Sequence, residues 1–171
     1  MKPTHDSTRI LLAVRNWFIF LSFGIALLLD LMPAPPGWPD WVALVLTFWC
    51  VREPLKVGMA TGFALGIAVD VADAAVMGEH ALGYVLLAYA AGALSRRILW
   101  FPLSLQALHV LPLLLAMQVV TLAARMLGGA AFPGWTPFLA SLSGAALWIP
   151  LNYLLLAPQY RPVEKDENRP I

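Results

Sequence analysis

Residues 57–82, VGMATGFALGIAVDVADAAVMGEHAL, combine an apolar segment containing several glycines with an acidic turn. Gly58, Gly62, Gly66 and Asp70 follow one another at intervals of four residues. On a helix, residues four apart lie on one side, one above the other. Three positions of this side therefore carry no side chain, and the fourth carries a carboxylate. Such a glycine face lets another helix approach closely, as small residues do between helices in lipid.

The composition indicates a membrane protein. Of the 171 residues, 60% are hydrophobic and 12% are charged, whereas soluble domains have roughly 45–50% apolar and about 25% charged residues. Long apolar runs alternate with short polar segments, which is typical of a chain that crosses a membrane several times. The single cysteine, Cys50, lies in an apolar run and excludes an intramolecular disulfide. We interpret it as a small buried hydrophobe rather than a reactive thiol.

The apolar runs predict an all-α, polytopic membrane protein with about six transmembrane helices in one domain, residues 1–157. The expected helices cover residues 11–32, 39–52, 54–71, 81–95, 100–127 and 138–157, and residues 158–171 are expected to be a disordered cytoplasmic tail. The first run exceeds the 7–15 residues of a secretory signal core, so we interpret it as a membrane helix.

The length of the second helix and the positions of two prolines add detail to these expectations. The second run is short, because about twelve residues give only about 18 Å against a hydrocarbon thickness of about 30 Å. It must recruit flanking residues, let Arg52 snorkel, or lie where protein surrounds it. Pro54 suits the first turn of the third helix. Arg96 and Arg97 are expected to follow the end of the fourth helix, and Pro150 is expected to bend the sixth.

Basic residues predict the orientation. Of the eleven lysines and arginines, all but Arg125 fall in one set of predicted loops and termini. Positive charge accumulates on the cytoplasmic side, so both termini are expected there, with loops 33–39, 70–80 and 128–137 outside. The outer side gathers five acidic residues instead: Asp30, Asp40, Asp70, Asp73 and Glu79.

No motif for catalysis, cofactor binding or nucleic-acid binding is recognisable. His80, beside Glu79 and near Asp70 and Asp73, could contribute to a divalent-metal site, but no pair of histidines four apart is present to hold zinc. We favour a solvated capping loop. We therefore expect no catalytic, cofactor-binding or metal-binding residue and no enzymatic activity.

Polar residues inside the apolar runs leave two alternatives open. They could line a translocation path or form hydrogen bonds between helices, and the second is more common; they are His109, Gln118, Thr121, Arg125 and Asn152. Asp70 could be a polar group at a helix end. The sharper hypothesis is a structural pivot, bonded to donors at the start of the fourth helix.

The stretch resembles the rod shape-determining protein MreD family. The pattern F-x-x-G-x-x-x-D is carried by Phe63, Gly66 and Asp70, and G-x-x-A-L by Gly78, Ala81 and Leu82. The flanking matches are Trp49, Pro54, Tyr84, Ala88 and Tyr89. The resemblance is dense over residues 41–97. Ala74 departs from it, because many members have glycine at this turn.

The resemblance implies a role in bacterial cell-wall elongation. It implies a non-enzymatic membrane scaffold needed for rod shape and lateral peptidoglycan synthesis, located in the inner membrane and without a cofactor. The implied partners are MreC first, and MreB, RodA and a class B penicillin-binding protein within the same complex. The family is similar in topology to the six-helix substrate-binding components of energy-coupling-factor transporters. A small-molecule or vitamin-binding component is therefore the alternative function, and an intramembrane enzyme is a third, less favoured class.

The expected sites are contact surfaces. Gly58, Gly62, Phe63 and Gly66 are expected to pack against a helix, either within this chain or from MreC or another member of the complex. An outer-face corner is expected beside the periplasmic portion of that partner, and its residues are Asp70, Gly78, His80, Ala81 and Leu82.

Overall fold

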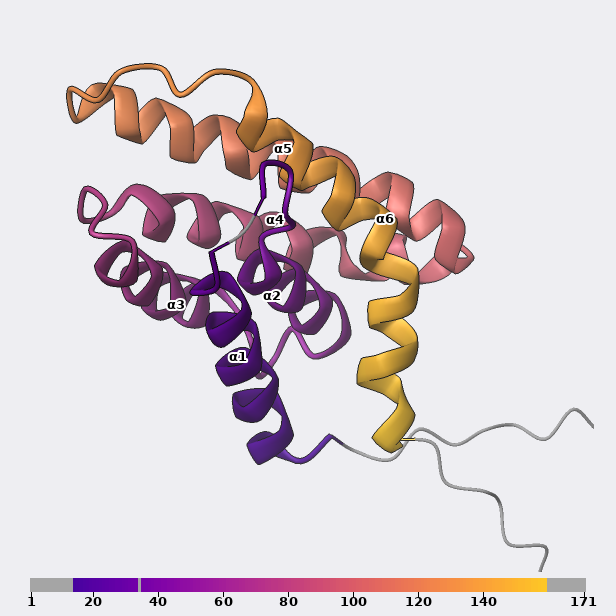
Figure 1. Ribbon diagram of the computed structural model, residues 1–171. Coiled ribbons are helices and arrows are strands. Elements are labelled where there is room, and N and C mark those ends of the chain that lie inside the picture. Colours follow the sequence, from indigo (N-terminus) through magenta and orange to yellow (C-terminus); the bar gives the residue numbers. More distant parts are fainter. Residues whose placement is uncertain (1–13, 34, 160–171) are drawn as a thin grey trace, which may run out of the picture.

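A computed structural model describes residues 14–33 and 35–159. Over these residues the chain contains helices and no strand (Figure 1), which confirms the all-α, six-helix expectation. The helices are α1 (Asn16–Asp30), α2 (Trp41–Arg52), α3 (Met59–Ala72), α4 (Glu79–Trp100), α5 (Leu103–Leu127) and α6 (Thr136–Leu156), followed by a 3-10 turn, η1 (Ala157–Gln159).

The helices fall into two length classes. Three are long and apolar enough to cross a membrane: α4, α5, and α6 together with η1. The other three, α1, α2 and α3, are apolar but have only 15, 12 and 14 residues. A helix of 14 residues is about 21 Å long and does not reach across about 30 Å of hydrocarbon.

α2 is the core of the molecule. Its residues from Val42 to Val51 are all buried, including Phe48 and Trp49. The Trp49 indole donates a 2.8 Å hydrogen bond to the Ser22 hydroxyl of α1, and the Phe48 ring packs against the rings of both Trp49 and Trp148. The shortness of α2 is therefore accommodated by protein around it, one of the three solutions that its length allows.

α4 connects the two halves of the bundle. It packs against α2, α3 and α5, while α6 packs on α5 and α1 packs on α2. Figure 1 shows the α3–α4 and α5–α6 connections on the same side of the molecule. Alternate helix ends therefore meet in one region, as antiparallel neighbours with short connections require.

The beginning of α3 differs from the expectation. Residues 54–56 form a turn, and the helix starts at Met59 after Gly58, so Pro54 is not in its first turn. The N–H groups of Lys56 and Val57 bond to the Glu53 carbonyl, which turns the chain before the helix begins. Similarly, α1 begins at Asn16, and residues 11–13 of the expected helix lie outside the described residues.

α4 extends five residues beyond the end at residue 95 that the sequence predicts. The helix continues through Arg96 and Arg97 to Trp100, because Ser95 and Ile98 point into the core while the two arginines point outward. It stops before Pro102, whose ring disfavours helical backbone at the preceding residue. α5 consequently starts at Leu103.

The last helix also departs from the expected ends. α6 starts at Thr136 with Pro137 in its first turn, where a missing N–H costs nothing. It contains Pro150, and Figure 1 shows that α6 bends along its length. η1 includes residues 158 and 159, with Gln159 buried, so the expected disordered tail does not begin at 158. Residues 160–171 lie outside the described part of the chain.

Candidate functional site

The glycine face of α3 packs against the start of α4 in the same chain. A Cβ added to Gly62 would lie 2.7 Å from the Tyr84 carbonyl oxygen. A Cβ added to Gly66 would overlap the backbone of Ala81 and lie 2.8 Å from the carbonyl carbon of His80. Backbone atoms cannot rotate away as side chains do. The two glycines are therefore required for the approach of α4.

Two residues of the expected packing surface do not take part in this contact. Gly58 precedes the first residue of α3, and a Cβ there would meet no atom within 4 Å. The Phe63 side chain is 55% exposed. Of the expected surface, only Gly62 and Gly66 therefore make the close contact, and the helix that packs against them is α4.

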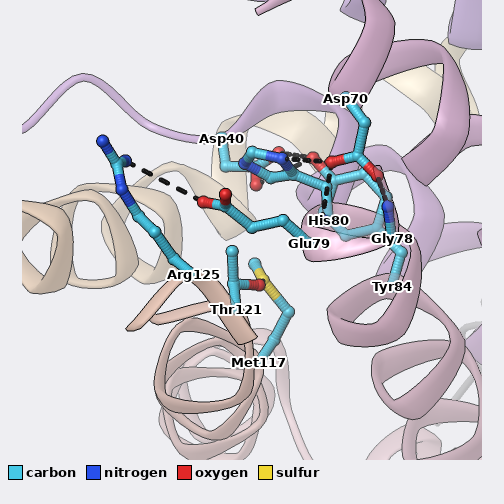
Figure 2. A network of polar contacts seen from close by, with 9 residues as sticks. All are labelled: Asp40, Asp70, Gly78, Glu79, His80, Tyr84, Met117, Thr121 and Arg125. Atoms are coloured by element: carbon cyan, nitrogen blue, oxygen red, sulfur yellow. Dashed lines mark hydrogen bonds and ion pairs between the residues drawn. The ribbon is translucent and has the colours of Figure 1, made fainter. Parts of the chain in front are cut away.

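The Asp70 carboxylate holds the first turn of α4. It accepts 2.8 Å hydrogen bonds from the N–H groups of Gly78 and His80, and His80 Nδ1 lies 2.9 Å from Oδ1. Asp70 is 1% exposed, and Figure 2 shows its carboxylate facing these groups. The bonds expected of a pivot between the third and fourth helices are thus present. A helix N-terminus has unpaired N–H groups and a positive dipole end, and the carboxylate satisfies both.

The turn between α3 and α4 contains Ala74, the position named above as a departure from the family pattern. Ala75 N–H bonds to the Asp70 carbonyl and Ala74 N–H to the Val71 carbonyl, which is the Schellman arrangement of a helix C-terminus. This arrangement requires positive φ at position 74, and Ala74 has φ of 50°. Glycine adopts this conformation without steric cost, so a preference for glycine here has a physical reason.

The other corner residues have separate positions. Gly78 has φ of 98° and precedes α4. Ala81 is buried against Gly66, whereas Leu82 is 55% exposed. The structure therefore brings Asp70, Gly78, His80 and Ala81 together and leaves Leu82 outside the cluster.

Two further carboxylates hold the start of α2. Asp30, at the end of α1, accepts 3.0 Å bonds from the N–H groups of Trp41 and Val42. Asp40 accepts a 2.7 Å bond from the Ala43 N–H and a 2.9 Å bond from the Tyr84 hydroxyl. Burial raises the pKa of the Asp40 carboxyl, and the Ala43 N–H, the charge of His80 and the Tyr84 hydroxyl oppose that shift.

These carboxylates and the neighbouring loops surround a cavity of about 300 Å³. We call this region the acidic end. Its acidic and basic lining residues are Asp30, Asp40, Asp73, Glu79, His80 and Arg125. Pro39, Pro133 and Pro137 also line it, so the first and third of the expected outer loops meet the start of α4 here. A sequence search by motif misses this cavity, because its lining comes from five helices and three connections. Only the one-sided distribution of acidic residues indicates it.

The polar residues considered for a translocation path separate into different places. Gln118, Thr121 and Arg125 line the cavity. Asn152 is buried elsewhere, accepting a 3.2 Å bond from Arg52 and donating one to the Trp148 carbonyl. His109 stacks on Phe101 and bonds to the Leu105 carbonyl. These residues do not form one continuous row.

The opposite end of the bundle is basic. Arg96 and Arg97 line a second cavity together with Trp100 and Phe101, and Trp100 is 89% exposed. Within residues 14–33 and 35–159, no group of three or more His, Cys, Asp or Glu side chains is arranged to hold a metal ion. The two ends of the bundle thus differ in charge, as the sequence indicated.

Comparison with known proteins identifies the family. The sequence model of the family described as rod shape-determining protein MreD matches residues 12–157. A protein of Haemophilus influenzae described as rod shape-determining protein MreD is 32% identical over 160 residues, covering 88% of this chain and 96% of the relative. No solved structure matches the chain. The chain therefore belongs to the MreD family of rod shape-determining proteins.

Proposed function

We propose that this membrane protein is a non-enzymatic scaffold of the cell-wall elongation complex, needed for lateral peptidoglycan synthesis. It binds MreC and works within the same complex as MreB, RodA and a class B penicillin-binding protein. The observation that carries this proposal is the family match over residues 12–157. The geometry is consistent with a non-enzymatic role. The carboxylates of Asp30, Asp40 and Asp70 accept hydrogen bonds at helix starts, which is a structural role.

The proposed location is the bacterial inner membrane, with both termini in the cytoplasm. The support for this orientation is the separation of charge between the two ends. Arg96 and Arg97 lie at the end opposite to the acidic end, and positive residues favour the cytoplasmic side. In this orientation the acidic end faces the periplasm.

Depletion of the protein tests the role in cell shape. Round cells with reduced lateral wall synthesis are expected, together with recovery of MreC when the tagged protein is purified from native membranes. Rod-shaped cells after complete depletion would contradict the proposed role. Absence of MreC from the purified material would contradict the proposed contact.

The surface for MreC must lie outside the Gly62–Gly66 contact. α4 already covers this part of α3, so a Gly66→Leu variant would test the fold and not the partner contact. Phe63 and Ala64 are exposed on α3 and are the better positions. Phe63→Ala is expected to reduce MreC recovery while the folded fraction stays unchanged. Phe20→Ala makes the same change at an exposed position of α1, outside both expected contact surfaces, and is the matched control.

A carrier component remains the second candidate because of the cavity at the acidic end. Its volume of about 300 Å³ lies at the lower limit of small-molecule sites. Mass spectrometry of small molecules bound to the purified protein distinguishes the two functions. A stoichiometric metabolite, together with lost nutrient uptake and retained rod shape after depletion, would favour the carrier.

A further inference from the structure

The cavity at the acidic end has more carboxyl groups than basic side chains. Four carboxyl groups line it, those of Asp30, Asp40, Asp73 and Glu79, against one arginine and one histidine. Asp30 and Asp40 have hydrogen-bond donors at helix starts. Asp73 is exposed. Glu79 is buried but accepts no hydrogen bond from a helix start, unlike Asp30 and Asp40.

Glu79 is a buried carboxylate with an incomplete set of partners. It is 5% exposed and lies in the first turn of α4. Its one close partner within the described residues is Arg125, with Nη1 3.8 Å from Oε1, and no hydrogen bond reaches its carboxylate. The carboxylate lines the cavity, so a group that enters the cavity can supply the hydrogen bonds that it lacks. Figure 2 shows Glu79 directed toward Arg125 across the polar network.

We propose that the cavity receives the guanidinium or ammonium group of a basic side chain from an extramembrane segment of a partner protein. This inference rests on the proposed function, since it assumes a protein partner at the acidic end. The donors of the basic group would complete the hydrogen bonding of Glu79 and offset the charge of the surrounding carboxylates.

Charge complementarity favours this occupant over others. An anion would face four carboxyl groups, and an apolar side chain would leave Glu79 as it is. A basic side chain also has an apolar stem, for which Trp38 at the rim offers an aromatic surface. The volume of about 300 Å³ accommodates one long side chain.

Arg125 is only a partial partner for the Glu79 carboxylate. Its side chain is 47% exposed and lies at the distance of a loose ion pair from Glu79. Because the guanidinium half of the pair is exposed, water competes for it and weakens the interaction. Arg125 can therefore turn toward solvent when a second cation enters, without breaking a hydrogen bond to Glu79.

The first test uses small probes on the full chain in lipid nanodiscs. N-acetyl-L-arginine amide is expected to raise the melting temperature, since a ligand of the folded state stabilises it. N-acetyl-L-citrulline amide, the neutral analogue, is expected to have little effect. Glu79→Gln is expected to weaken binding of the arginine amide about tenfold, the usual effect of losing a charge-assisted hydrogen bond.

Two further variants serve as controls. Glu53→Gln makes the same chemical change at the basic end, where Glu53 pairs with Lys56 at 3.3 Å, and is expected to bind the probe like the unaltered chain. Asp73→Asn changes an exposed lining residue whose side chain makes no hydrogen bond or ion pair within the described residues. It is expected to weaken binding even if Glu79→Gln unfolds the protein. Equal effects of both amides, or no loss of binding in either cavity variant, would overturn the inference.

The second test identifies the source of the basic group. A photo-reactive amino acid at position 38, on the cavity rim, is expected to cross-link in cells to a partner peptide containing lysine or arginine. The yield should fall about tenfold with Glu79→Gln and stay unchanged with Glu53→Gln. An equal yield in both variants would overturn the inference. Recovery of MreC with the unaltered chain is measured separately, so the proposed function can stand when this inference fails.

Discussion

α2 and α3 are both too short to cross a membrane, and the fold accommodates them in opposite ways. α2 is enclosed by large side chains, with every residue from Val42 to Val51 buried. α3 lies at the edge, and its close contact uses the absence of side chains at Gly62 and Gly66. A short apolar helix can therefore be stabilised by enclosure or by one close backbone contact, and we expect the two kinds of packing to respond differently to mutation.

Removing volume from α2 is expected to have the largest effect. Trp49→Ala should lower the free energy of unfolding by about 3–5 kcal/mol, because it leaves a cavity in the core and removes the bond to Ser22. Chemical unfolding in detergent micelles, followed by circular dichroism, measures this. Trp100→Ala, at an 89% exposed position, is the control and should change little. Similar losses for both variants would mean that α2 is not the core.

Adding volume to α3 is expected to have the next effect. Gly66→Ala should cost about 1–3 kcal/mol, because the new methyl group meets the backbone of Ala81 and α4 must shift. Gly58→Ala inserts the same group where no atom lies within 4 Å and should cost less than about 0.5 kcal/mol. The same unfolding measurement applies. If the two variants lost equal stability, the effect would come from glycine flexibility and not from the contact.

The end of α3 offers a change that should stabilise the protein. Ala74→Gly is expected to raise the free energy of unfolding by about 0.5–1 kcal/mol, because it relieves the positive φ of 50°. α5 also ends in a Schellman arrangement, with Gly129 at the position of positive φ. Gly129 has φ of 88°, and a Cβ added there would meet no atom within 4 Å. Gly129→Ala should therefore cost a similar amount. A loss of stability in Ala74→Gly would mean that the turn is not strained.

The outer face of α3 should tolerate substitution best. Ala64→Leu adds a large side chain at an exposed position and should change the free energy of unfolding by less than about 0.5 kcal/mol. Its effect on MreC recovery is measured in parallel. A loss of more than about 2 kcal/mol would show that this face is packed in the folded chain, and the contrast between the two sides of α3 would then be wrong.

Much of the fold was readable from local patterns. The intervals between apolar runs predicted six helices, and the four-residue spacing of Gly62, Gly66 and Asp70 predicted a close contact followed by a polar corner. Helix ends were less predictable. Pro54 suited a helix start by its local chemistry, but the chain turns at Glu53 and reaches α3 only at Met59.

The site was harder to predict because its contacts are distant in sequence. Asp40, directly before an apolar run, could have been recognised as a helix cap from the sequence. Asp30 caps the same helix across eleven and twelve residues, and the Tyr84 hydroxyl reaches Asp40 across 44 residues. Phe63 belongs to the same pattern as Gly66, and yet it is exposed.

The sequence alone determined the class of protein, the number of helices, the opposite charge of the two ends and the glycine face of α3, because each depends on local composition or helical periodicity. Only the tertiary structure decided that α4 covers this face, that α2 lies in the core and that four carboxyl groups meet at one cavity. The physical reason is that a face without side chains permits a close contact but does not specify the partner. That choice depends on the packing of the whole bundle.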